Sequence, residues 1–331
     1  MSDILSPEES VHDLTQEKES ELIEELYINL FTDTDDPKPN GVVEYTPLMS
    51  LIRRWLTNLP AETELEFVSA IRNLSTVTPI QRWSLFGGSG VGGKFFARLS
   101  AVLADMYDIH VAFPSCVIAE HENDKRMFLH DQSGCGFIVD KVSELASESA
   151  MNTLDPTGES TLLPFCRAID GGFPCKARSS LNNNRKANLH CVRQQRASTG
   201  EGFAETLEVV LRHVPDMVLL ECVTELQESG DDGESDAEYI VNAFRQNNYW
   251  AHCVQVDARD WGSFVSRIRA YWPALGELKD APSEDITFFF TKIMNSLKLG
   301  KQLPWDPKSE APWKLQLFVE TFLFYSLCVV V

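Results

Sequence analysis

The chain has 331 residues and 44% of them are hydrophobic, which is enough apolar material to bury the core of one large domain. Its 29 basic and 49 acidic residues give a net charge of −20, which argues against a surface that grips nucleic acid through a broad basic face. The acidic, polar start lacks a charged and then apolar leader, so we expect a nuclear or cytoplasmic protein that is not secreted. The eight cysteines include no Cys-x-x-Cys pair, which favours reduced thiols and predicts no metal site.

The first 82 residues divide into two parts. Residues 1–37 carry 12 acidic residues and one lysine, so we expect residues 1–41 to be a mostly disordered acidic segment and linker. Within it, the apolar spacing of residues 20–30 permits one amphipathic helix. Residues 42–82 have the apolar spacing of two amphipathic helices and are expected to be a helical cover.

A glycine-rich turn follows the first expected strand. It reads Phe86-Gly87-Gly88-Ser89-Gly90 and precedes an amphipathic helix that runs to Met106. Such a turn lets the backbone approach a ligand, and the helix N-terminus offers N–H donors to it. Glycines also occur at such turns for packing alone, and the turn by itself leaves both interpretations open.

Two further expected strands end in acids. Residues 116–120 end in Glu120, whose carboxylate can bind both hydroxyls of a ribose about thirty residues after the glycines. Residues 136–140 end in Asp140, a candidate partner for a cofactor base. Each acid is equally well explained as the cap of a following helix.

A cysteine and a glutamate are expected at one edge of the sheet. Cys175 follows a Gly-Gly-Phe-Pro turn, a stiff bend of the kind that holds a nucleophile. The buried run 217–220 reads as a strand that delivers Glu221 at its carboxyl end, where open α/β sheets place their chemistry.

Basic residues gather in two places in this acidic chain. Between Arg167 and Arg196 there are seven basic residues and a single acid, and this stretch, with residues 198–202 after it, has the composition of a long mobile loop. Arg178, Arg185 and Lys186 of this loop are candidate phosphate contacts, although a solvated surface loop is the other interpretation. Arg267 and Arg269 alternate along an expected strand and point to one face, where they could bind phosphate and a base edge.

The order of these elements resembles the cytosine-5-specific DNA methyltransferases, over residues 83–272. The first family motif, Phe-x-Gly-x-Gly, matches residues 86–90, and the ribose acid matches Glu120. The Gly-Phe-Pro-Cys loop matches residues 172–175, and the Glu-Asn-Val motif appears as residues 221–223. The Gln-x-Arg-x-Arg motif survives as Arg267 and Arg269.

The resemblance implies an α/β, Rossmann-like fold that binds S-adenosyl-L-methionine, with a mostly parallel sheet and helices on both faces. It implies Cys175, Glu221, Arg267 and Arg269 as catalytic residues, and Phe86, Gly87, Gly88, Gly90, Glu120 and Asp140 as cofactor-binding residues. The chain departs from the family at four positions: Ser84 replaces Asp, Lys176 replaces Gln, Cys222 replaces Asn and Val265 replaces Gln. Residues 273–331 are too short for the family's target-recognition region and its last two motifs.

Three functions remain open at this point. The first is methyl transfer from S-adenosylmethionine to C5 of cytosine in DNA, through a thiolate adduct on Cys175. The second is the same chemistry on RNA, which suits an acidic protein without a large recognition region. The third is a scaffold that binds the cofactor without turnover, which the altered motifs favour.

Overall fold

The structure is a computed structural model that describes residues 47–59, 61–75, 79–88, 91–230, 233–257 and 267–276. The predictions for residues 1–41, for Gly90 and for the C-terminal region from residue 277 onward lie outside the described residues. The domain boundaries expected after residues 41, 82 and 272 stay predictions. Residues 45–331 form one compact unit, and the fold below is that of its described part.

Helices and strands alternate along most of the described chain, which is typical of an α/β fold. The α-helices are α2 (Pro47–Thr57), α3 (Ala61–Ser75), α4 (Val91–Tyr107), α5 (Asn123–Ser133), α6 (Ala197–His213) and α7 (Asp236–Gln246). Three short 3₁₀ helices are η1 (Val142–Ala146), η2 (Arg185–Asn188) and η3 (Thr224–Gln227). The strands are β1 (Arg82–Leu85), β2 (Ser115–Ala119), β3 (Ile138–Val139), β4 (Ser149–Met151), β5 (Ser160–Leu162), β6 (Ala168–Gly172), β7 (Met217–Val223), β8 (Trp250–Ala251), β9 (Val254–Asp257) and β10 (Ile268–Leu275).

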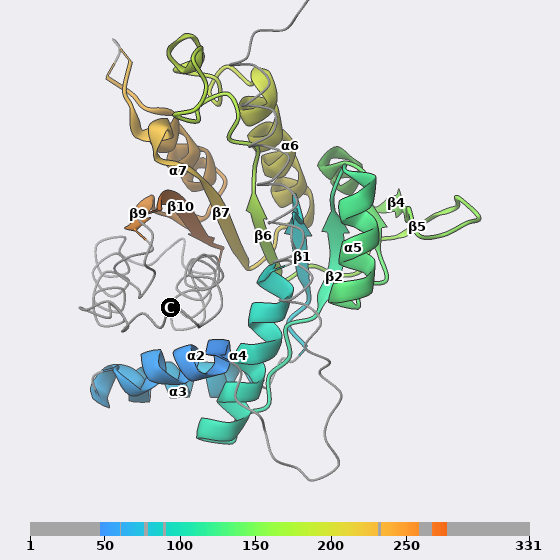
Figure 1. Cartoon of the computed structure of the whole chain (residues 1–331), viewed down its shortest axis with the longest axis vertical. Helices are drawn as coiled ribbons and strands as arrows, with labels where there is room; N and C mark the ends of the chain where they lie inside the picture. Colours follow the sequence, from blue (N-terminus) through green and yellow to red (C-terminus); the bar gives the residue numbers. More distant parts are fainter. Residues whose placement is uncertain are drawn as a thin grey trace, which may run out of the picture. The chain divides into compact units, whose positions relative to one another are not determined.

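Eight of the described strands build one sheet in the order β3-β2-β1-β6-β7-β10-β8, with β9 also paired to β10 (Figure 1). Strands β4 and β5 form a separate antiparallel pair. Neighbours from β3 to β7 are parallel, whereas β10 is antiparallel to β7, β8 and β9. From β1 the chain adds β2 and β3 on one side of the sheet and then β6 and β7 on the other. A topological switch point therefore lies between β1 and β6. Ligands of open α/β sheets bind beyond the carboxyl ends of the strands at such a point.

The sheet is covered on both faces, which explains why β7 is apolar along most of its length. Met217 and Leu219 pack in a cluster with α2, α3 and α4. Val218 and Leu220 point the other way and pack with α6 and α7. The predicted α/β fold with a mostly parallel sheet and helices on both faces is therefore confirmed.

Two local predictions need correction. Residues 198–202 were expected to be loop, but α6 already begins at Ala197. A Cβ at Gly200 would lie 2.0 Å from the carbonyl oxygen of Cys191, so glycine is required there by close packing within a helix. Glu221 was expected at the end of its strand, but it lies inside β7.

In the part of the chain that the structure describes, no helix has both the length and the apolar character needed to span a membrane.

Candidate active site

Glu221 and Arg269 face each other across neighbouring strands. In the β7–β10 ladder, Glu221 is opposite Tyr271 and Val223 is opposite Arg269, so the two charged side chains lie on one face of the sheet. Arg269 Nε lies 3.0 Å from Glu221 Oε1, and each side chain keeps about a quarter of its surface exposed, 26% and 29%. On the other side, Gly172 of β6 pairs with Glu221, and a Cβ there would lie only 2.9 Å from Glu221 Oε2. The absent side chain at residue 172 makes room for the carboxyl group.

Burial raises the pKa of Glu221 above its ordinary value, while Arg269 and Arg267 oppose that shift and leave a net increase. A carboxyl group with a raised pKa retains its proton more readily and can donate a hydrogen bond. The position of Glu221 is therefore suited to a general acid.

Cys175 lies half-buried in a turn beside this pair. The backbone N–H groups of Arg178 and Ser179 donate to its carbonyl oxygen at 3.0 and 2.9 Å, which closes the turn. Burial and then Glu221 raise the pKa of the Cys175 thiol, whereas Arg269 and Arg267 lower it. The charges of Glu221, Arg267 and Arg269 thus all act on the Cys175 thiol. The catalytic roles of these four residues stay predictions.

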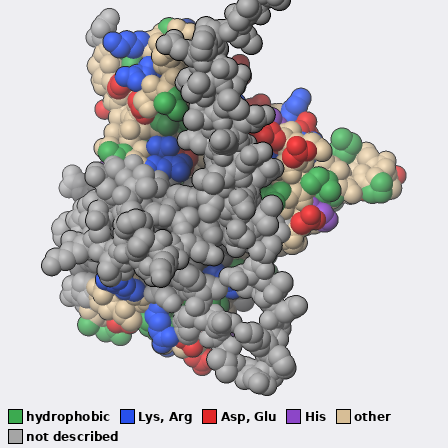
Figure 2. Space-filling view, viewed as in Figure 1, with side chains coloured by type: hydrophobic (Ala, Val, Ile, Leu, Met, Phe, Trp, Pro, Cys, Tyr) green, Lys and Arg blue, Asp and Glu red, His purple; other side chains and the backbone are tan. Residues whose placement is uncertain are grey.

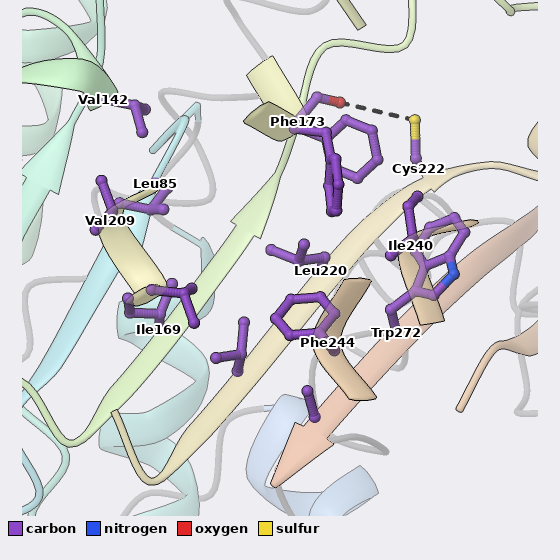
Figure 3. Close-up of a cluster of buried hydrophobic side chains, with 14 of the residues drawn as sticks. Leu85, Val142, Ile169, Phe173, Val209, Leu220, Cys222, Ile240, Phe244 and Trp272 are labelled. Atoms are coloured by element: carbon purple, nitrogen blue, oxygen red, sulfur yellow. Dashed lines mark hydrogen bonds between the residues drawn. The ribbon is translucent and has the colours of Figure 1, made fainter. Parts of the chain in front are cut away.

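The neighbouring thiol, Cys222, has a different setting. It is fully buried on the opposite face of β7, with its Sγ 3.8 Å from the carbonyl oxygen of Phe173 (Figure 3). Burial raises its pKa well above the ordinary thiol value. The Phe173 ring packs between Phe203 and Trp272, with ring centroids 5.9 and 6.1 Å away. Cys222 is a packed, unreactive thiol beneath the turn that carries Cys175.

On the β1 side, Glu120 holds the glycine turn. It is only 5% exposed, and its two carboxylate oxygens accept from Gly88 N at 2.8 Å and Glu122 N at 3.0 Å. Gly87 N donates to Ala119 O at 2.9 Å, and a Cβ at Gly87 would lie 2.5 Å from the Ile118 side chain. Gly88 has a positive φ of 51°, and a Cβ there would meet Phe86 O at 3.6 Å as its one neighbour among the described residues. The turn is therefore pinned to β2.

These residues fit the ribose of S-adenosylmethionine. Each Glu120 oxygen accepts one backbone N–H, and His121 Nδ1 also lies 3.3 Å from Oε1, so Oε2 is the oxygen that keeps a lone pair for a hydroxyl group. Asp140 is less free to bind a cofactor, because Arg126 Nη1 already lies 2.5 Å from its carboxylate. Glu120, His121 and Glu122 also place one possible ligand atom each within 4.8 Å of one another, although His121 and Glu122 are exposed.

The two halves of the site meet at α6. A Cβ at Gly202 would lie 2.7 Å from Pro174 Cδ and 3.4 Å from the end of the Phe86 ring. Phe86 of the cofactor side and Pro174 of the Cys175 turn therefore both contact the same point on one helix. Phe86 and the turn that carries Cys175 thus meet near the carboxyl ends of β1 and β6.

The prediction that Arg178 contacts phosphate is wrong. Its side chain is fully buried and donates to the backbone of Arg185 and Glu225 and to the Glu228 carboxylate. A guanidinium group that is removed from water in this way cannot reach a ligand on the surface.

Other cations of the basic stretch also have acidic partners. Arg193 pairs with Glu234 at 3.0 Å and Arg167 pairs with Asp216 at 2.7 Å. Lys186 is exposed and Arg185 is half-exposed, so both remain candidates for phosphate contact. On the face drawn in Figure 2, basic and acidic side chains of the described residues are interspersed.

One charged network beneath the site was not predicted. Arg82 of β1 is fully buried, its Nη1 lies 2.6 Å from Asp170 on β6, and its guanidinium stacks over the Phe96 ring. Ser84, which stands where the family has Asp, donates to the same Asp170 carboxylate at 3.0–3.1 Å. The carboxylate that β1 lacks is supplied from the neighbouring strand. A charged residue on each of two buried strands is the signal that could have revealed this pair.

A cavity of about 780 Å³ lies elsewhere in the described part of the chain, between the segment after β7, helix α7 and residues 252–253. Neither Cys175 nor Glu221 lines it, so it is not the site described above.

Part of the sequence matches the model of a known protein family. Residues 151–305 match the model of the C-5 cytosine-specific DNA methylases. A search of curated proteins finds no match to the sequence.

Two solved structures are similar to this chain. One is described as a DNA modification methyltransferase encoded within a prophage of E. coli; it has 16% identity and a TM-score of 0.40, over 62% of this chain and 50% of its own. The other is a mutant of DNMT2 from Spodoptera frugiperda, with 13% identity and a TM-score of 0.38; the match covers 59% of this chain and 49% of the DNMT2 chain. This chain thus spans about half the length of each. The family match confirms, over residues 151–305, the resemblance to the C-5 cytosine-specific DNA methylases that the sequence showed.

Proposed function

We propose that this protein transfers a methyl group from S-adenosylmethionine to C5 of cytosine in DNA. The observation that carries the proposal is geometric: Gly172, three residues before Cys175, pairs with Glu221, and Pro174 before Cys175 meets Phe86 of the glycine turn on α6. When bound, S-adenosylmethionine supplies an electrophilic methyl group. Gly88 and Glu120 are the residues that would hold its ribose.

The chemistry of the pair follows from the substrate. Cytosine C5 is a poor nucleophile, so the Cys175 thiolate adds at C6 and turns C5 into a carbon that can accept the methyl group. Glu221 donates a hydrogen bond to the ring N3, which stabilises the negative charge that this addition produces. Loss of the C5 proton and of the thiolate then restores the ring. Because a stacked base is out of reach of both groups, the nucleotide must leave its duplex or be presented by a loop.

RNA is the second candidate substrate, for a specific reason. Three basic residues near the site are paired with acids or buried, which leaves few cations for a DNA backbone. A preformed RNA loop with unstacked bases demands fewer phosphate contacts.

The test is covalent trapping. Fluorine at C5 leaves no proton to lose after methyl transfer, so the Cys175 adduct should persist. Intact-mass measurement after incubation with S-adenosylmethionine and DNA or RNA that contains 5-fluorocytosine should show one covalent complex. Cys175→Ser should abolish it, whereas Cys222→Ala and Cys253→Ser should retain it.

Each other outcome has a defined meaning. An adduct with RNA alone would assign the enzyme to RNA. An adduct at a different cysteine would overturn the role of Cys175. A folded chain that binds S-adenosylmethionine but forms no adduct with either nucleic acid would favour the scaffold without turnover.

A further inference from the structure

Arg178 is a charged side chain with no contact to solvent. It lies three residues after Cys175 and is 0% exposed. Its Nη1 donates to the carbonyl oxygen of Arg185 at 2.8 Å, and its Nη2 donates to the carbonyl oxygen of Glu225 and to Glu228 Oε2, the latter at 2.8 Å. Burying a guanidinium group costs free energy unless such partners compensate it. The burial of the Arg178 charge at this position therefore needs an explanation.

The contacts of Arg178 join the two segments that carry the proposed reacting groups. Its own N–H donates to Cys175 O, so it belongs to the turn that holds the thiol. Glu225 lies in η3, which directly follows β7, the strand of Glu221. Leu226 of η3 is fully buried and anchors that short helix in the core. One guanidinium group thus ties the Cys175 turn to the continuation of the Glu221 strand.

The other contacts of the turn reach both β7 and α6. Gly172 pairs with Glu221 in the β6–β7 ladder, and Cys222 Sγ lies 3.8 Å from Phe173 O. Ala177 N lies 3.3 Å from Thr199 Oγ1, and Pro174 packs against Gly202, which are both contacts with α6. The far end of the loop is held separately, because Val192 N and Arg193 N donate to the buried Asp236. Arg178 adds charged hydrogen bonds between the turn and the segment that follows β7.

We propose that Arg178 is a positioning residue that fixes the Cys175 thiol relative to the Glu221 carboxyl group. The assignment rests on the proposed function, in which these two groups act on one base. Arg178 touches neither of them, so it acts through the turn and η3. Its burial also means that the basic loop is attached to the body of the protein through this turn.

The experiment measures the Cys175 thiol itself and needs no nucleic acid. Arg178→Met, Arg178→Lys and the wild type are alkylated with iodoacetamide across a pH series, and the rate at Cys175 is followed by peptide mass mapping. Arg196→Met is the matched control, because Arg196 is an exposed residue of the same loop that bonds only within it, to Ala187 O. The groups that face Cys175 are Glu221 and Cys222 from β7, and Arg267 and Arg269 from β10 and the residue before it.

Release of the turn exposes the thiol and moves it away from Glu221, the two causes that raise its pKa. We expect Arg178→Met to move the Cys175 profile toward lower pH and to raise its rate at pH 7 roughly three- to tenfold, because reactivity follows the thiolate fraction. Arg178→Lys should give a smaller shift in the same direction, since an ammonium group keeps the charge but not the planar set of donors. Arg196→Met should match the wild type.

An unchanged Cys175 profile in folded Arg178→Met would overturn the proposal and leave Arg178 as an ordinary buried residue. If that variant does not fold, an unchanged profile in Arg178→Lys has the same meaning. On a substrate identified by trapping, Arg178→Lys should lower kcat roughly tenfold with KM unchanged, as expected when only the transition state is affected. A wild-type chain that traps no substrate would defeat the proposed function, yet the thiol measurement would still decide the role of Arg178.

Discussion

Two arginine–glutamate pairs close to Cys175 differ in what surrounds them. Arg269 and Glu221 are each about a quarter exposed, and the guanidinium group faces the carboxyl group of the site. Arg178 is fully buried, its partner Glu228 is half-exposed, and its Nη1 and Nη2 also donate to backbone carbonyls. The first pair is open to a substrate and the second holds the loop in place. The comparison shows that a basic stretch in a sequence is not in itself a binding surface, because its cations can be used inside the fold.

The largest effect on kcat is expected for a change in the Arg269–Glu221 pair. Glu221→Gln removes the proton donor and should lower kcat about 10²–10⁴-fold. The pKa of Glu221 and that of Cys175 are both raised, and the reaction needs Glu221 with its proton and Cys175 without its own, so the wild-type rate should have a bell-shaped pH profile. Glu221→Gln should lose the limb of that profile that falls as the pH rises. Steady-state kinetics across pH on the trapped substrate would measure both effects.

Glu205→Gln is the control for that experiment. Glu205 lies on α6 outside the site, and its pKa is also raised, by burial and by Glu201 and Glu208. It should leave kcat and its pH profile unchanged. A profile for Glu221→Gln that still falls at the wild-type pH would show that another group provides the acid.

The next largest effect concerns the buried network beneath the site. Asp170→Asn removes the carboxylate that pairs with the fully buried Arg82 and should lower the free energy of unfolding by about 3–5 kcal/mol. Asp216→Asn is matched in geometry, since its pair with Arg167 has a similar distance of 2.7 Å but is partly exposed. It should cost less than about 1 kcal/mol. Urea denaturation would measure both, and equal losses would contradict the role of burial.

Much of this arrangement follows from patterns that are local in the chain. The apolar run before Glu221 predicts a strand covered on both faces, and the Gly-Gly-Phe-Pro sequence predicts the bend before Cys175. The first holds in the structure, because burial acts within a few residues. The second differs, because Gly171 and Gly172 end β6 and the turn closes on Cys175 itself, through Arg178 N and Ser179 N. The glycine turn after β1 is also predictable from a few neighbouring residues.

The failures are properties of distant contacts. Arg178 reads as a surface cation because Glu225 and Glu228, which take up its charge, lie about fifty residues further on. Residues 198–202 read as loop because glycine disfavours helices, yet Gly200 and Gly202 lie in α6 where the backbone of Cys191 and the ring of Pro174 approach too closely for a Cβ. In both cases tertiary packing overrides the local preference.

An intermediate effect is expected for the cofactor side. Glu120→Ala should weaken binding of S-adenosylmethionine by about 1–3 kcal/mol, the usual cost of leaving buried polar groups unpaired. Glu122→Ala removes a neighbouring, half-exposed carboxylate that pairs with Lys125 and should have little effect. Calorimetry on the folded variants would compare the two. Equal losses, or no wild-type binding at millimolar cofactor, would contradict the assignment of Glu120.

The smallest effect is expected for the cations that stay on the surface. With Arg178 buried, Arg185 and Lys186 are the predicted phosphate contacts of the loop that remain accessible, so nucleic-acid binding should depend only weakly on salt. Neutralising both, as Arg185→Gln with Lys186→Gln, should reduce the slope of log K against log salt by about 1–2. Arg212→Gln is the control, because Arg212 is an exposed cation paired with Glu148. A steep wild-type slope that the double variant leaves unchanged would place the phosphate contacts on another surface, and the loop held by Arg178 would then have a structural role alone.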